Sequence, residues 1–220
     1  MWISKSYTDA DFHGNPTPDQ KIEIFRDRVM GWQIDIAKEM VRQIETTTRP
    51  DVMNHAGYAV LSVLTSYFEM YWQYKQGVSS DHQSAHYFAL GFAEVYPTFP
   101  MSHADIKDKV YKWLRCGMYH DGFTKRGVTI DSRYTQDCDY DATDDELKIN
   151  PHSMVATIEN RFAGFIATLK VDAAARGRFL RIFDQYMPTP PTASSPTATT
   201  PGPAPTPSLP HGSESGVRRP

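Results

Sequence analysis

The stretch LRCGMYHDG at residues 114–122 combines a side chain that can hold phosphate with one that can transfer protons. It places Arg115 and His120 five residues apart. Histidine titrates close to neutral pH, while arginine stays charged and grips a phosphate through its planar fork. Such a pair can transfer a proton by general acid–base action and can offset negative charge at a phosphate. These roles make it a candidate catalytic pair.

Three interpretations of Arg115 and His120 are open from these residues alone. They form a catalytic pair, Cys116 between them belongs to a metal or redox site, or they only satisfy the last carbonyls and the dipole of a helix. Five residues of α-helix rotate by about 500°, which leaves the two side chains roughly 140° apart. Convergence therefore needs a loosened helix at Gly117, a helix end with Gly122 in a left-handed conformation, or a second copy of the chain.

The elements that must position this stretch are helical. Between residues 19 and 186, apolar side chains recur every three or four residues and charged ones fill the opposite faces, a pattern typical of amphipathic helices. Ser102 with Asp105, and Asn150 before Pro151, are typical of helix starts. We expect helices over residues 19–45, 51–76 with Asp51 as cap and Gly77 as stop, 84–96, from 102 into the Arg115 stretch, from 150 onward, and 172–186.

A departure from helix is expected after Gly122. Val128 and Ile130, and again Leu147 and Ile149, form short alternating runs around an acidic loop. Such runs are typical of strands in a small hairpin. The sequence therefore predicts an all-α helical bundle with a small β-hairpin excursion.

Composition divides the chain into three parts. Residues 1–18 read as an irregular N-terminal segment, residues 19–187 as the helical domain, and residues 188–220 as a disordered tail rich in Pro, Thr and Ser. The tail has too few apolar side chains to offset the entropy of ordering. The 220 residues, 40% of them hydrophobic, can supply one full core. The net charge of -3 gives no overall attraction to nucleic acid, so any RNA-binding surface must be local.

The sequence predicts neither a membrane protein nor a secreted one. The longest apolar stretch, at residues 58–74, is interrupted by polar side chains and is too polar for a membrane span. The first 20 residues contain no sustained apolar run of the kind found in signal peptides. Two cysteines, Cys116 and Cys138, allow at most one disulfide. We expect a reduced, cytoplasmic protein.

Other groups that could bind metal lack a full set of ligands. His82 and His86 have the four-residue spacing of a zinc pair, but no third ligand is apparent nearby. The acidic run at residues 137–146 resembles a calcium loop, yet Ala142 stands where the sharp turn needs glycine, and Lys148 where a bidentate glutamate is needed. We expect no metal and no cofactor.

The segment RCGMYH at residues 115–120 resembles the Arg-X-X-X-X-His signature of the HEPN superfamily (higher eukaryotes and prokaryotes nucleotide-binding). This superfamily consists of small α-helical bundles, many of which are metal-independent endoribonucleases. The late position of the segment in the bundle and the Ile-Asn-Pro stretch at residues 149–151 are similar to uncharacterised bacterial members. The resemblance implies a cleft between two protomers that cleaves RNA with Arg115 and His120. Cys116 departs from the Asn, Asp or His that usually follows the arginine in active members.

The resemblance also implies partners: RNA as substrate, a second copy in a homodimer, and an antitoxin or defence-system partner, as in bacterial defence or toxin modules. Residues expected to contact the substrate are Lys112, Tyr119, Lys125 and Arg126, within a locally basic region at residues 105–133. The same lysines equally suit the solvated face of an amphipathic helix. The alternative is a non-catalytic helical module of the same fold, which binds nucleotide or a protein partner.

Overall fold

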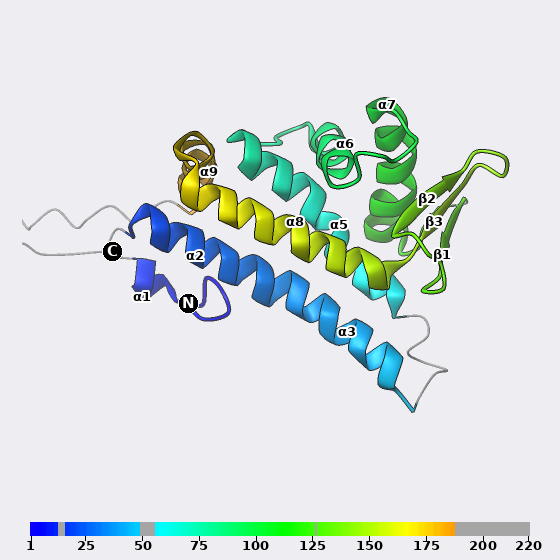
Figure 1. Cartoon of the computed structure of the whole chain (residues 1–220), viewed down its shortest axis with the longest axis horizontal. Coiled ribbons are helices and arrows are strands. Elements are labelled where there is room, and N and C mark those ends of the chain that lie inside the picture. The colour runs from blue at the N-terminus through cyan, green and yellow to red at the C-terminus, as the bar shows by residue number, and fades with distance from the viewer. Residues whose placement is uncertain (13–15, 49–55, 126, 188–220) are drawn as a thin grey trace, which may run out of the picture. The chain divides into compact units, whose positions relative to one another are not determined.

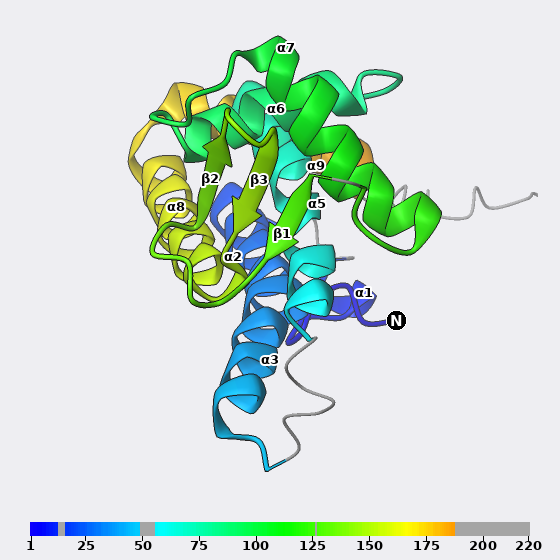
Figure 2. The same cartoon turned by 90° about the vertical axis from the view of Figure 1, so that its right-hand side faces the viewer.

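The structure is a computed structural model and describes residues 1–12, 16–48, 56–125 and 127–187. Helices make up most of this part, and one small sheet lies at one end of it, as Figures 1 and 2 show. The expected disordered tail at residues 188–220 and the expected cap Asp51 lie outside the described residues. No helix in the described part of the chain combines the length and the apolar character needed to cross a membrane.

The first predicted helix consists of three consecutive helical segments. α2 (Pro18–Val29) begins at the N-cap Thr17, η1 (Met30–Ile34) is one turn of π-helix, and α3 (Asp35–Thr46) continues the rod. In Figure 1 this rod runs beside α8 (Pro151–Val171), against which all three segments pack. The apolar spacing at residues 19–45 therefore predicts one long helix correctly.

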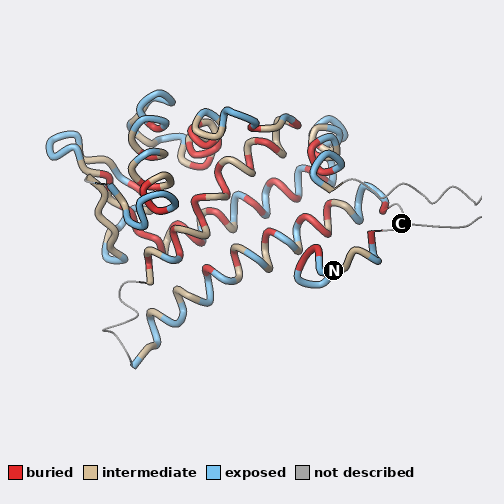
Figure 3. The backbone as a smooth tube through the Cα atoms, turned by 180° about the vertical axis from the view of Figure 1, so that it is seen from behind, coloured by how far each residue is buried: buried red, intermediate tan, exposed pale blue. Residues whose placement is uncertain are grey.

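The helix α5 (Gly57–Gln76) lies at the centre of the bundle. It packs against α3, against α6 (Ser84–Val95), against α8 and against α9 (Ala173–Tyr186). It ends at Gly77, as expected. Figure 3 shows that buried residues line the facing sides of these helices. The largest side chains that are fully buried in the core include seven aromatic ones: Tyr67, Phe68, Phe88, Phe92, Phe162, Phe179 and Phe183.

The fourth predicted helix departs from α-helical geometry. Ser102 caps it, since its hydroxyl accepts a hydrogen bond from the Asp105 N–H at 3.2 Å. A short α7 (His103–Asp105) then passes into η2 (Ile106–Asp121), a π-helix. Along η2 the buried apolar side chains recur at every fourth residue: Ile106, Val110, Leu114 and Met118.

The sheet has three strands, in the order β1–β3–β2 (Figure 2). They are β1 (Val128–Ile130), β2 (Cys138–Asp141) and β3 (Glu146–Ile149). The prediction that the runs at residues 128–130 and 147–149 form the hairpin was wrong: these strands are parallel, and β2 is the hairpin partner of β3. The central strand buries Leu147 and Ile149 completely, which calls for a neighbour on each side.

The N-terminal segment, expected to be irregular, contributes to the core. It contains a short helix, α1 (Asp9–Phe12), and buries Ile3 and Phe12 in the same apolar cluster as the bundle. The carboxylate of Asp27 in α2 accepts a hydrogen bond from the hydroxyl of Ser4 at 2.6 Å. A polar contact on α2 thus holds this segment beside the helical domain.

Candidate active site at the end of helix η2

Arg115 and His120 lie one turn apart near the end of η2. In a π-helix the backbone hydrogen bonds join residues i and i+5, so Arg115 and His120 are separated by one hydrogen-bonded turn. The expected separation of about 140° holds only for an α-helix. The helix at residues 106–121 is a wider π-helix, so that figure does not apply to it. π-Helical turns occur frequently at functional sites.

The helix ends at Gly122, which adopts the left-handed conformation with φ of 76°. The chain then folds back along η2, where the Lys125 N–H donates to the Trp113 carbonyl oxygen at 3.0 Å. A Cβ atom at Gly117 would lie 2.7 Å from the Phe123 carbonyl oxygen. Gly117 therefore makes room for the returning chain.

The guanidinium of Arg115 lies against aromatic rings. Its Cζ is 4.8 Å from the ring centroid of Tyr119 and 5.6 Å from that of Tyr111. The Tyr119 hydroxyl donates to the Ser62 carbonyl oxygen of α5 at 2.6 Å, which fixes one of these rings. Burial raises the pKa of Tyr111, and the positive charge of Arg115 opposes this rise. Arg115 has no carboxylate partner among the described residues, so its N–H donors are available to an anion.

His120 is exposed and forms no hydrogen bond or ion pair with a described residue. Its neighbours on the surface are also rings: Tyr119 is 50% exposed and Phe123 is 64% exposed. A substrate or a second protein surface therefore has direct access to the imidazole.

The lysines expected to contact a substrate are engaged in ion pairs. Lys112 Nζ lies 2.8 Å from an Asp108 carboxylate oxygen, and Lys125 Nζ lies 3.3 Å from one of Asp121. All four side chains are exposed, and such pairs are typically worth about 0–1 kcal/mol. A phosphate can compete for these lysines at little cost. Arg126 lies outside the described residues.

Carboxylates also neutralise much of the basic region around the motif. Four of its cations form ion pairs: Lys109, Lys112, Lys125 and Arg133. Lys109 on η2 contacts Asp145 of the acidic loop, so helix and loop offset each other's charge. Arg115 and Lys107 remain without a carboxylate partner among the residues that the structure describes.

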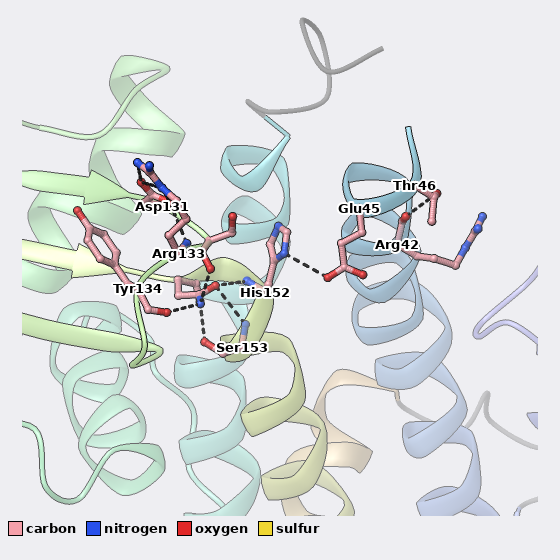
Figure 4. A network of polar contacts seen from close by, with 10 residues as sticks. Arg42, Glu45, Thr46, Asp131, Arg133, Tyr134, His152 and Ser153 are labelled. Carbon is pink, nitrogen blue, oxygen red and sulfur yellow. Dashed lines mark hydrogen bonds and ion pairs between the residues drawn. The ribbon is translucent and has the colours of Figure 1, made fainter. Parts of the chain in front are cut away.

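Two hollows in the described surface lie away from this pair. One of about 590 Å³ is lined by Trp113, Gly127 and the acidic turn at residues 144–146. The other, of about 420 Å³, includes His152, whose Nδ1 lies 3.5 Å from Glu45 Oε1 (Figure 4). Neither hollow is lined by Arg115 or His120, which instead lie on an open surface. A second surface would have to enclose a substrate there.

The junction between the sheet and α8 is held by Asn150. Its side-chain N–H groups donate to the carbonyl oxygens of Ser132 at 3.1 Å and Tyr134 at 2.7 Å. Its side-chain oxygen accepts from the backbone N–H groups of His152 at 2.9 Å and Ser153 at 3.3 Å. Figure 4 shows the labelled members of this network close together. Asn150 is thus the predicted cap of α8, and its polar atoms are fully used by the fold.

Within the described residues, no group of three or more His, Cys, Asp or Glu side chains is arranged to hold a metal ion. The two histidines with zinc-like spacing do not share a regular helix, because His82 has a φ of 60° in a turn before α6. Cys116 and Cys138 are both free. Burial raises the pKa of the Cys138 thiol well above its usual range, which keeps it from acting as a thiolate.

Sequence reasoning missed three residues of this surface. Tyr111 stands four residues before Arg115, and that spacing alone indicates a contact along a helix. Phe123 carried no sequence signal beyond its place after a glycine. The Ser62 contact joins residues 57 positions apart, which no local pattern indicates.

No family model, no curated protein and no solved structure matches this chain. Membership of the HEPN superfamily stays a prediction from the segment at residues 115–120. The function has to be inferred from the geometry around Arg115 and His120.

Proposed function

We propose that this protein is a metal-independent endoribonuclease of the HEPN type, which acts as a homodimer in the bacterial cytoplasm within a defence or toxin module. The observation that supports it is the placement of Arg115 and His120 one π-helical turn apart, at the exposed end of η2. The defence role rests on the family resemblance alone.

The chemistry follows from the two side chains. Arg115 binds the scissile phosphate and offsets the charge that grows on its oxygens. His120 takes the proton of the 2′-hydroxyl, and that oxygen attacks the phosphorus. The bond from phosphorus to the 5′-oxygen breaks, and a protonated imidazole returns a proton to the leaving oxygen. The products are a 2′,3′-cyclic phosphate and a 5′-hydroxyl, and no metal takes part.

A second protomer completes the site in this proposal. Each chain has one His120, whereas the reaction uses a base and an acid. A two-fold interface at the end of η2 places two imidazoles and two guanidiniums around one phosphate. It also encloses a surface that is open in the single chain and covers the exposed rings of Tyr119 and Phe123 in part.

The alternative is a binding module of the same fold without catalysis. Cys116 after the arginine and the ion pairs of Lys112 and Lys125 favour it. Such a protein would bind nucleotide or a protein partner at the same surface. Both candidates use Arg115 and His120 to bind the ligand, and only the endoribonuclease uses His120 for proton transfer.

The test is cleavage of a labelled single-stranded RNA in the presence of EDTA. We expect the wild type to cut, and His120→Ala to lose about 10²- to 10⁴-fold in rate while its melting temperature stays the same. Arg115→Ala should lose rate and also bind RNA more weakly, with an affinity that depends less steeply on salt. The matched control is His103→Ala, which removes an exposed histidine at the other end of the same helical segment and should cut normally.

Three results would count against the endoribonuclease. Cleavage that needs added divalent metal contradicts the mechanism, and so does a His120→Ala variant that cuts like the wild type. Tight binding of RNA without cleavage supports the binding module instead. Light scattering on the full chain tests the dimer, since a strict monomer removes the shared cleft.

A further inference from the structure

The end of η2 displays rings to solvent, although most of the other aromatic side chains of the chain are buried or half-buried. Tyr119, His120 and Phe123 lie within five residues of one another, and all three are exposed. The ring of Tyr119 makes a cation–π contact with Arg115, and its hydroxyl donates a hydrogen bond to the Ser62 carbonyl oxygen. The ring of Phe123, which is 64% exposed, makes no ring–ring or cation–π contact with a described residue.

The backbone that carries Phe123 is fixed, although its side chain is free. The carbonyl oxygen of Phe123 approaches η2 so closely that only a glycine fits at position 117. Two residues later the Lys125 N–H is bonded to the Trp113 carbonyl, and the Lys125 ammonium lies 3.3 Å from the Asp121 carboxylate. The turn is therefore tied to the helix, which fixes the backbone from which the Phe123 ring projects.

The position of this ring relative to the candidate catalytic pair limits what it can contact. Phe123 follows His120 by three residues, so their Cα atoms lie at most about 11 Å apart. A flat apolar ring with open faces binds a nucleobase by stacking, which tolerates every base because each base has a π-face.

We propose that Phe123 is a stacking platform for an unpaired nucleobase next to the phosphodiester that Arg115 and His120 address. This inference rests on the proposed function and adds a requirement to it. A base inside a duplex is covered on both faces by its neighbours, so the substrate must be single-stranded or splayed at this position. Selection of the cleavage site then depends on an accessible base more than on its identity.

Binding alone tests the platform, without any cleavage. The probe is a fluorescent single-stranded oligodeoxynucleotide, which lacks the 2′-hydroxyl and stays intact, titrated with the full chain. Phe123→Ala should raise Kd by about 5- to 150-fold, while Phe123→Trp should keep or tighten binding. The matched control is Trp2→Ala, because Trp2 is 62% exposed but belongs to the N-terminal segment, and its Kd should not change.

Abasic sites identify the stacked base. One abasic nucleotide at the right position should weaken binding to the wild type but not to Phe123→Ala. The same probe in a duplex should bind with a Kd that does not respond to Phe123→Ala. These two results together support the platform.

The outcomes separate this inference from the proposed function. An unchanged Kd for Phe123→Ala overturns the platform, whether or not the protein cuts RNA. The platform is also overturned if Phe123→Ala changes only the dissociation constant of the dimer. That result would assign the ring to an interface between copies of the chain. If His120→Ala still cuts RNA, the endoribonuclease fails while the binding result for Phe123 stands.

Discussion

The junction at Asn150 and the end of η2 use their polar side chains in opposite ways. At the junction all four hydrogen bonds of the Asn150 side chain go to backbone groups. At the end of η2, Arg115 and His120 have no polar partner among the described residues. The first arrangement stabilises the fold, and the second leaves donors for a ligand.

Burial explains part of this difference. Asn150 is only 6% exposed, and a buried amide without partners would be costly. His120 is exposed, so solvent can satisfy its ring nitrogens without a protein partner. Arg115 is the informative residue, because it is half-buried and lies against two tyrosine rings, while its side-chain N–H groups have no polar partner in the described part of the chain. A search for function should weigh such positioned but unpaired groups above merely exposed ones.

Breaking the junction should have the largest effect on stability. Asn150→Ala removes the cap of α8 and leaves two carbonyl oxygens without their donors, so we expect a loss of about 3 kcal/mol. Urea denaturation measures it, and cleavage per folded molecule should not change. The control Asn160→Ala alters an exposed asparagine of the same helix and should cost nothing. A loss below about 1 kcal/mol for Asn150→Ala would mean that water replaces its bonds.

A substitution at Gly117, beneath the turn, should lower the stability of the protein less than Asn150→Ala does. It should affect ligand binding more. At Gly117→Ala the new Cβ would lie 2.7 Å from the Phe123 carbonyl oxygen, so the turn must shift, at a cost of about 1–3 kcal/mol. We expect weaker binding of single-stranded probe together with this loss. The control is Gly164→Ala in α8, where no atom lies within 4 Å of the new Cβ; it should keep or raise stability. Unchanged probe binding in Gly117→Ala would separate the turn from the site.

The helices of this protein could be predicted from spacing, whereas the geometry of η2 could not. Caps at Ser102 and Asn150 and the stop at Gly77 are local signals, and the structure has all three where they were expected. Buried residues at every fourth position, as in η2, are compatible with both an α-helix and a π-helix, so this spacing does not distinguish the two. The angle between Arg115 and His120 depends on which of the two helix types forms. In the structure the π-helix packs against α5 and α6, and the sequence pattern does not reveal that helix type.

Contacts between distant residues account for most of the other differences. A pairing of β1 with β3 in parallel requires the chain to cross to β2 first, and alternation alone shows only that each run is a strand. The ion pair of Lys109 with Asp145 joins positions 36 apart and offsets a basic region that the sequence alone left unpaired. The burial of Ile3 and Phe12 similarly depends on tertiary contacts, which composition could not indicate.

The smallest expected effect is a pH dependence at the junction. The Arg133 side chain, which reaches Asp131 at 2.5 Å, and the Arg133 backbone N–H lower the pKa of the Asp131 carboxyl to about 2 (Figure 4). A carboxyl with a lowered folded-state pKa stabilises the protein above its unfolded pKa of about 3.9, and this contribution is lost as the pH falls from about 4 through about 2. Urea midpoints at pH 7 and below pH 4 should therefore diverge more in the wild type than in Asp131→Asn.

The pair lies at the surface, where salt screens it, so the divergence should be smaller than the effects of Asn150→Ala and Gly117→Ala and should shrink in high salt. Arg133→Gln is a second test variant. It should reduce the pH dependence of the urea midpoint over the same pH range, because it removes the cation but keeps the carboxylate. Equal midpoint shifts on acidification in wild type and both variants would show that Asp131 contributes nothing there. In that case Asn150 would hold the junction through its hydrogen bonds to neutral backbone groups. The junction, like η2, would then contain both polar groups that stabilise the fold and polar groups that do not.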